Sequence, residues 1–162
     1  QGLYDLSDNR SLNNDLFSQI INTICAIANI GPDADGFIFF GVADKQNDAE
    51  RIKSLDNIEY KSINKRHVVG VDREFTLLGG DIEKYVNKIM GEISKSELTE
   101  PIKSQVLNQL DVIDYKGLTV LRIRIPMQKE MSFVGTKSYT RENSKTIELK
   151  GPKLISISKL FQ

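Results

Sequence analysis

The chain has 162 residues, of which 22 are Lys or Arg and 22 are Asp or Glu, so its formal net charge at pH 7 is zero. This length fits one domain over residues 1–162 whose core needs no disulfide or metal, and the single cysteine, Cys25, excludes a disulfide framework and fits a reducing cytoplasmic setting. No apolar run approaches the ~20 residues of a membrane-spanning helix, so we expect a cytoplasmic protein without a membrane partner.

The basic and acidic residues are distributed unevenly along the chain. Residues 1–100 contain 11 basic and 17 acidic side chains, whereas residues 101–162 contain 11 basic and 5 acidic ones. A basic C-terminal part is compatible with a phosphate-bearing partner, although a bias of this kind is also common in proteins without one. Motifs must therefore decide between these interpretations.

The first predicted element is a helix over residues 13–29, because apolar side chains recur there at intervals of three and four. Turn-forming residues follow from Gly31 to Gly36, and the aromatic run over residues 37–40 predicts a buried strand. Further along, the patterns predict a short helix over 47–56, a polar connection over 57–66, a short strand over 68–71 and a second long helix over 80–93.

The C-terminal part predicts mainly strands. Residues 106–115 and 118–125 predict a hairpin that turns at Lys116-Gly117, and alternation in its second strand places Arg122 and Arg124 on the face opposite the apolar residues. Another hairpin is predicted over 133–141, and Gly151-Pro152 opens a last amphipathic segment.

Helices and strands mix here without strict β-α-β alternation. The predicted fold class is therefore α+β: a single two-layer domain in which a mixed β-sheet carries the two long helices packed on it. Its predicted core contains Ile20, Ile24, Ile27, Phe39, Val42, Tyr85, Ile89, Leu121 and Ile123.

Three motifs resemble one known family. The segment ICAIANIGPDADGFIFFGVADK, residues 24–45, resembles the signature of the Schlafen AlbA-like domain, in which a helix ends in Ala-Phe-Ala-Asn and a following strand ends in Gly-Val-x-Asp. VLRIRIP (120–126) and SYTRENSKT (138–146) resemble later patterns of that family, so the resemblance extends from about Tyr4 to Thr146. It implies the Schlafen AlbA-like fold, a nucleic-acid partner (RNA or DNA), and two lobes that a one-lobe chain would supply as a homodimer.

The resemblance also implies a candidate catalytic and metal site. In the family members that cut RNA, the position of Asp44 is one of three carboxylates in a metal-assisted nuclease site, and Asp5 falls at a second such position. The third would lie before the first residue of this sequence. If the chain is a nuclease, Asp5 and Asp44 would hold Mg²⁺ or Mn²⁺, which activates water and stabilises charge on phosphate. The alternative for Asp44 is a turn residue after a strand.

Basic side chains form the candidate nucleic-acid-binding set. Cations along a groove neutralise phosphates without reading bases, and the alternative is a solvated sheet face. Arg141 stands out because it follows Tyr139, a ring that can stack on a base or belong to the core. The complete set is Lys65, Arg66, Arg122, Arg124, Lys137, Tyr139, Arg141 and Lys145.

Taken together, the motifs favour a nucleic-acid-binding module, mainly of backbone contacts, within a larger bacterial regulatory or defence protein that supplies further domains. No clear enzyme signature accompanies them, so the motifs favour binding over catalysis without deciding the question, and Mg²⁺ or Mn²⁺ is expected as a cofactor only if the chain is a nuclease. Two alternatives stay open: a metal-dependent endoribonuclease of Schlafen type with clustered carboxylates, and a protein-interaction or sensor domain that has kept only the fold.

Overall fold

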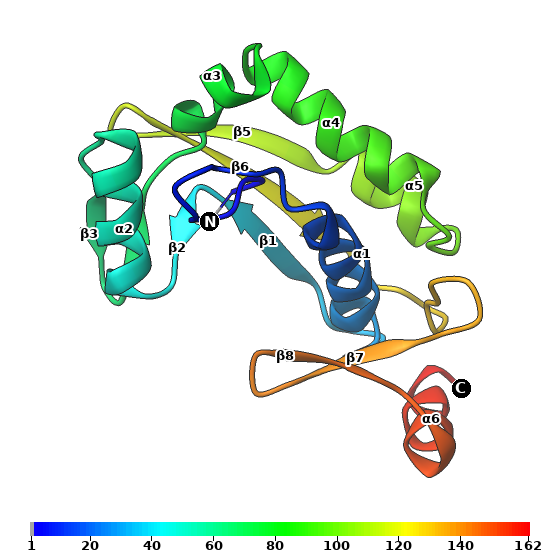
Figure 1. Ribbon diagram of the computed structural model, residues 1–162. Coiled ribbons are helices and arrows are strands. Elements are labelled where there is room, and N and C mark those ends of the chain that lie inside the picture. Colours follow the sequence, from blue (N-terminus) through cyan, green and yellow to red (C-terminus); the bar gives the residue numbers. More distant parts are fainter. Residues whose placement is uncertain (1) are drawn as a thin grey trace. The chain divides into compact units, whose positions relative to one another are not determined.

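The computed structural model describes residues 2–162, and Figure 1 shows the course of the chain. The chain divides into two compact units, each built from three separate segments. Unit 1 contains the described residues up to Asn14, Phe39–Lys88 and Asp111–Arg122, and unit 2 contains Asp15–Ile38, Ile89–Leu110 and Ile123–Gln162. The prediction of one domain over 1–162 stays a prediction.

The helix predicted over residues 13–29 is α1 (Asn14–Ala28). Its apolar side chains share one face, which buries Phe17, Ile20 and Ile24. The last turn of the helix contains small buried residues, so its backbone packs closely against neighbouring segments of the chain. Asn29, directly after the helix, is completely buried. This end of α1 is therefore fixed by packing on several sides.

The strand predicted over residues 37–40 is β1 (Gly36–Phe40), but only one of its faces is buried. Phe40 is 4% exposed, whereas Phe37 and Phe39 are 44% and 47% exposed. Successive side chains of a strand point to opposite faces, so an apolar run does not bury all its members. The placement of Phe39 in the core was wrong for this reason, and Val42 is only half-buried. The other predicted core residues are buried: Ile20, Ile24, Ile27, Tyr85, Ile89, Leu121 and Ile123.

The strands form small separate sheets instead of the mixed sheet expected from the sequence. One has the order β1-β6-β5, where β5 (Leu110–Tyr115) and β6 (Leu118–Ile125) join at Lys116 and Gly117, both with positive φ, as the predicted hairpin requires. The second sheet has the order β2-β4-β3, formed by Val42–Ala43, Arg66–Val68 and Lys61–Ile63, and the third is the pair β7-β8, formed by Tyr139–Glu142 and Lys145–Glu148.

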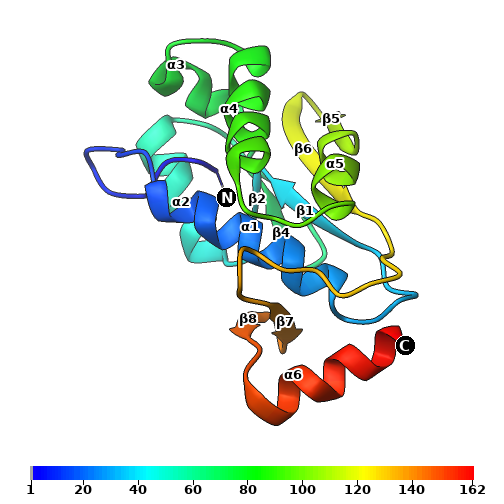
Figure 2. The same ribbon diagram turned by 90° about the vertical axis from the view of Figure 1, so that its right-hand side faces the viewer.

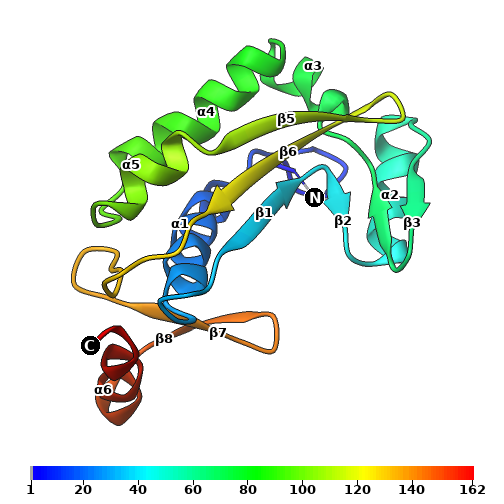
Figure 3. The same cartoon turned by 180° about the vertical axis from the view of Figure 1, so that it is seen from behind.

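The sheet β2-β4-β3 belongs to unit 1. It consists of β2 (Val42–Ala43), β3 (Lys61–Ile63) and β4 (Arg66–Val68), all antiparallel, and α2 (Gln46–Asp56) lies beside it (Figure 3). The residues predicted as a polar connection, 57–66, thus contain β3 and the first residue of β4. All three residues of β3 are exposed, so no apolar alternation marked it as a strand.

Gly41 allows three segments of unit 1 to meet. Its φ is 91°, and a Cβ at this position would lie 3.1 Å from the backbone of Gly70 and from the Thr119 carbonyl oxygen. The Gly41 carbonyl accepts hydrogen bonds from the N–H groups of Val69 and Gly70. A side chain here would separate these segments.

Unit 2 ends in a strand pair and a helix (Figure 2). The strands β7 (Tyr139–Glu142) and β8 (Lys145–Glu148) pair around Asn143 and Ser144, whereas the hairpin predicted over 133–141 is reduced to one bridge between Val134 and Lys137. The predicted strand 106–115 begins only at Leu110, because Val106 belongs to the helix α5 (Ile102–Leu107). The other helical elements are η1 (Asp72–Glu74), α3 (Phe75–Leu78), α4 (Ile82–Lys95), α5 (Ile102–Leu107), α6 (Gly151–Ser158) and η2 (Lys159–Phe161). Within residues 2–162, no helix is both long enough and apolar enough to cross a membrane.

Candidate functional site

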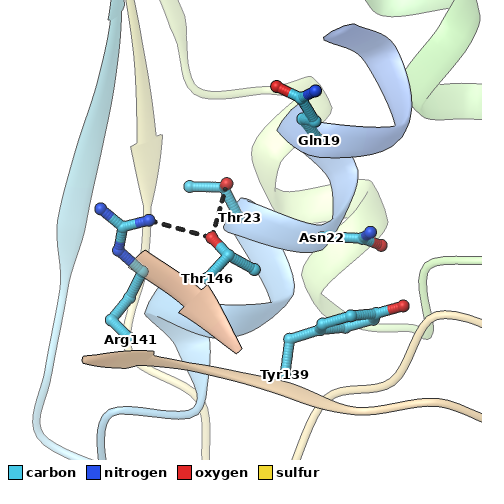
Figure 4. A pocket seen from close by; sticks show the side chains of 6 residues that line it. All are labelled: Gln19, Asn22, Thr23, Tyr139, Arg141 and Thr146. Atoms are coloured by element: carbon cyan, nitrogen blue, oxygen red, sulfur yellow. Dashed lines mark hydrogen bonds between the residues drawn. The ribbon is translucent and has the colours of Figure 1, made fainter. Parts of the chain in front are cut away.

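A pocket of about 350 Å³ lies in unit 2 (Figure 4). Helix α1 contributes one side of it and the strand pair β7-β8 contributes the other. None of the lining side chains is acidic, and one is a cation. The lining residues are Gln19, Asn22, Thr23, Tyr139, Arg141 and Thr146.

The helical period of α1 places its three pocket residues on one side. Gln19, Asn22 and Thr23 are spaced three and four residues apart, which aligns them on a helix surface, while Ile20 and Ile24 are turned into the core. Asp15 is the only charged residue within α1. The helix therefore offers the pocket carboxamides and a hydroxyl, and no charge.

The register of β7-β8 sets the opposite side of the pocket. Tyr139 and Arg141 are two residues apart on β7 and share a face, and Thr146 of β8 pairs directly with Arg141. The Arg141 Nη1 atom donates to the Thr146 hydroxyl at 2.9 Å, and that hydroxyl lies 3.0 Å from the Thr23 hydroxyl of α1. These contacts hold the guanidinium at the pocket through one of its five N–H groups.

Arg141 is the one arginine in the described part of the chain without a carboxylate partner. The guanidinium groups of the other arginines lie within 4.0 Å of a carboxylate oxygen. Arg141 thus combines a pocket position with a charge that no acidic side chain neutralises. The paired arginines are Arg10, Arg51, Arg66, Arg73, Arg122 and Arg124.

On the face of β7-β8 that carries Tyr139 and Arg141, the acidic side chain is Glu148, which pairs with Tyr139 across the two strands. Its carboxylate lies 3.4 Å from the Lys150 Nζ atom and 3.9 Å from that of Lys137, so two cations offset its charge. Burial, followed by the Glu148 charge, raises the pKa of the Tyr139 hydroxyl. The tyrosine therefore stays neutral at physiological pH.

Asn29 fixes the backbone beside the pocket. Its side-chain oxygen accepts from the Ser132 N–H at 2.8 Å, and its amide nitrogen lies 2.9 Å from the Ser132 and Tyr139 carbonyl oxygens and from the Ser138 hydroxyl. The Cys25 Sγ atom also donates to Ser132, and burial raises the pKa of its thiol to about 11. The position of Tyr139 is thus tied to the end of α1.

The remaining predicted basic residues do not line the pocket. Arg122 and Arg124 lie on the face of β6 opposite the buried Leu121, Ile123 and Ile125, as predicted. Each nevertheless contacts a carboxylate, Asp111 at 2.6 Å and Asp35 at 2.9 Å respectively. Lys65, Arg66 and Arg122 belong to unit 1, whereas Arg124, Lys137 and Lys145 belong to unit 2 with the pocket.

The two carboxylates that the resemblance implies as metal ligands both lie in unit 1, where each contacts another side chain. Asp44 is exposed and lies 3.1 Å from Arg66. Asp5 accepts from the Ser7 hydroxyl at 2.6 Å, and this hydrogen bond is the main cause that lowers the pKa of the Asp5 carboxyl. Neither belongs to a group of three or more metal-ligating side chains, a grouping that residues 2–162 do not contain.

A buried carboxylate in unit 1 has a different role. Glu74 is completely buried and accepts hydrogen bonds from the Leu3 N–H at 2.7 Å and the Tyr85 hydroxyl at 2.6 Å. Burial, followed by the Glu74 charge, raises the pKa of Tyr85, which therefore remains a donor. The carboxylate holds the N-terminal segment to α4, and we assign it to the stability of unit 1.

Asp56 and two arginines extend this buried cluster. Asp56 contacts the guanidinium of Arg10 and, at 2.8 Å, that of Arg73, whose Nη2 atom lies 3.1 Å from Glu74. Burial opposes ionisation of Asp56, but hydrogen bonds from Arg10 and Arg73 outweigh it and lower the pKa of the carboxyl. No sequence pattern indicated this cluster, since its members come from three distant segments.

No protein-family model, curated protein or solved structure matches the chain. The function is therefore inferred from the pocket in unit 2 and from the charges around it.

Proposed function

We propose that the chain is a nucleic-acid-binding module that contacts RNA or DNA mainly through the phosphate backbone, at the pocket of unit 2. The observation that carries the proposal is the placement of Arg141: its guanidinium lines the pocket, is oriented by Thr146 and has no carboxylate partner within residues 2–162. A planar guanidinium with open N–H groups binds phosphate oxygens at two points. The other lining side chains are uncharged, so they add no repulsion against that anion.

The aromatic side chain next to Arg141 supports the same function. Tyr139 is half-buried and lines the pocket two residues before Arg141. An aromatic ring beside a cation is the usual combination for binding nucleic-acid strands, in which the ring stacks on bases and the cation binds the backbone.

The resemblance supports a more specific assignment, that the chain is a Schlafen AlbA-like domain of a bacterial regulatory or defence protein. Tyr139, Arg141 and Thr146 all lie in the segment that resembles the third family pattern. Asn29 and Gly41, which belong to the first pattern, have the buried and tightly packed positions that such a motif requires.

The proposal is tested by fluorescence polarisation with labelled single-stranded RNA and DNA at low salt. We expect binding by the unmodified chain and about tenfold weaker binding by Arg141→Ala, because a hydrogen-bonded charge contact to phosphate is lost. Arg51→Ala is the matched control, since it removes the same group from an exposed ion pair with Asp8 in unit 1.

We expect Arg51→Ala to bind like the unmodified chain. Both variants lose one positive charge, so a difference between them cannot come from net charge. Equal affinities of the two variants, or no binding of either polymer by the unmodified chain, would contradict the proposal.

A further inference from the structure

We infer that the pocket takes one unpaired nucleotide, with its phosphate on Arg141 and its base beside Tyr139 and Asn22, so that the chain prefers single strands to duplexes. This inference rests on the proposed function and names the form of nucleic acid that the same pocket recognises.

The size of the pocket supports a single nucleotide. Its volume of about 350 Å³ lies at the lower end of the range of small-ligand sites, roughly 300–1,000 Å³. A duplex offers its bases already paired and stacked, and only its phosphates could approach the rim. An unpaired base can turn out of its strand and enter.

The lining chemistry separates into two ends. Figure 4 shows Asn22 and Tyr139 on one side of the Thr23–Thr146 pair and the Arg141 guanidinium on the other. The carboxamide of Asn22 combines a donor and an acceptor, which matches the edge of a base, and the Tyr139 ring offers a stacking surface. The Arg141 guanidinium is the one charged group of the lining, so it suits the anionic part of the nucleotide.

The hydroxyl groups of Thr23 and Thr146 lie between these two ends of the pocket. Thr146 accepts from Arg141 and lies 3.0 Å from Thr23, so the strand and the helix are linked at the centre of the pocket. The guanidinium is thereby oriented before any ligand binds, while four of its N–H groups remain for phosphate oxygens. Orientation in advance lowers the cost of binding.

The inference is tested with three labelled probes of equal length: a single-stranded oligonucleotide, the same strand annealed to its complement, and an abasic strand with the same phosphates. We expect the base-bearing single strand to bind about tenfold more tightly than either of the others, because only it offers a stacking base. We expect Asn22→Ala to reduce this preference severalfold and to leave the abasic strand unaffected.

The outcomes separate the two proposals. If all three probes bind equally and all depend on Arg141, the pocket binds phosphate alone, and the inference fails while the proposed function stands. If no probe binds, both fail. If Asn22→Ala weakens all three probes alike, the base does not contact the carboxamide, and the inference also fails.

Discussion

Arg73 is almost completely buried and lies between two carboxylates, 2.8 Å from Asp56 and 3.1 Å from Glu74. Charges removed from water in this way are costly to separate, because each depends on its partner for compensation. Arg141 differs from Arg73 in that its partner is a hydroxyl, and its charge remains available to a ligand. At the residue scale, similar groups thus serve stability in unit 1 and, by our proposal, binding in unit 2.

This contrast predicts a large effect of Asp56→Asn on stability. The change leaves Arg10 and Arg73 without their shared carboxylate, and we expect the free energy of unfolding at pH 7 to fall by about 3 kcal/mol. Asp8→Asn, in the exposed pair with Arg51, should change it by less than about 0.5 kcal/mol. Chemical denaturation monitored by circular dichroism measures both. Equal effects of the two variants would contradict the role assigned to the buried cluster.

The same carboxyl predicts a direction of pH dependence. The folded-state pKa of Asp56 is lowered, so its contribution is complete above the unfolded-state value of about 3.9 and is lost as the pH falls through the folded value. The difference in stability between the unmodified chain and Asp56→Asn should therefore shrink below about pH 4. A difference that stays constant from pH 7 to pH 3 would contradict this.

At the scale of elements, the end of α1 is joined to the segment around residue 132 and to β7 by one side chain. Asn29 makes these hydrogen bonds in a fully buried position, where an unpaired polar group would be costly. The opposite side of the pocket is therefore positioned by the residue that ends the helix.

Asn29→Ala should loosen this junction and expose Cys25. We expect a loss of about 2 kcal/mol in the free energy of unfolding and about tenfold faster alkylation of Cys25 at pH 8, because the buried thiol, with its raised pKa, becomes accessible through local opening. Mass spectrometry after iodoacetamide treatment measures the rate. In the Asn22→Ala variant, which changes a half-buried polar residue on the pocket side of the same helix, Cys25 should be alkylated at the rate of the unmodified chain. Similar alkylation rates for the two variants would contradict the proposed role of Asn29 in joining these segments.

Elements with a strong sequence period were predictable, and elements defined by tertiary contacts were not. The residues of α1 and the hairpin at Lys116-Gly117 followed their patterns closely. The strand β3 was missed because all of its side chains are exposed, and α5, with six residues, is too short for a period to appear. In β1 the strand was predicted, but the face that Phe39 occupies was not.

Only the part of the pocket lining that comes from β7 was predicted from the sequence. Arg141 and Tyr139 were identified from the sequence, whereas the contributions of α1 were missed, since only the tertiary fold brings residues 19–23 beside β7-β8. One signal was available: outside its apolar face, α1 carries the uncharged polar residues Gln19, Asn22 and Thr23, where a solvated helix face commonly carries charges. The pairing of Arg122 and Arg124 with carboxylates had no comparable signal.

At the scale of the whole molecule, the uneven charge of the sequence disappears on folding. Unit 1 contains 12 basic and 13 acidic residues and unit 2 contains 10 and 9, because each unit draws its segments from both halves of the chain. Neither unit therefore has a large net positive charge that would attract a polyanion, and the proposed binding would depend on local groups. We expect few phosphate contacts, modest affinity and a shallow dependence on salt.

The salt dependence of binding tests the central claim, that Arg141 contacts phosphate. The affinity for a single-stranded oligonucleotide is measured by polarisation over a series of salt concentrations for the unmodified chain, Arg141→Ala and Arg51→Ala. Each phosphate contact contributes about 0.7 to the slope of log affinity against log salt concentration, so Arg141→Ala should have a slope smaller by about 0.7 and Arg51→Ala an unchanged one. If Arg141→Ala binds more weakly but keeps the full slope, Arg141 supports the pocket without contacting phosphate, and the claim is contradicted.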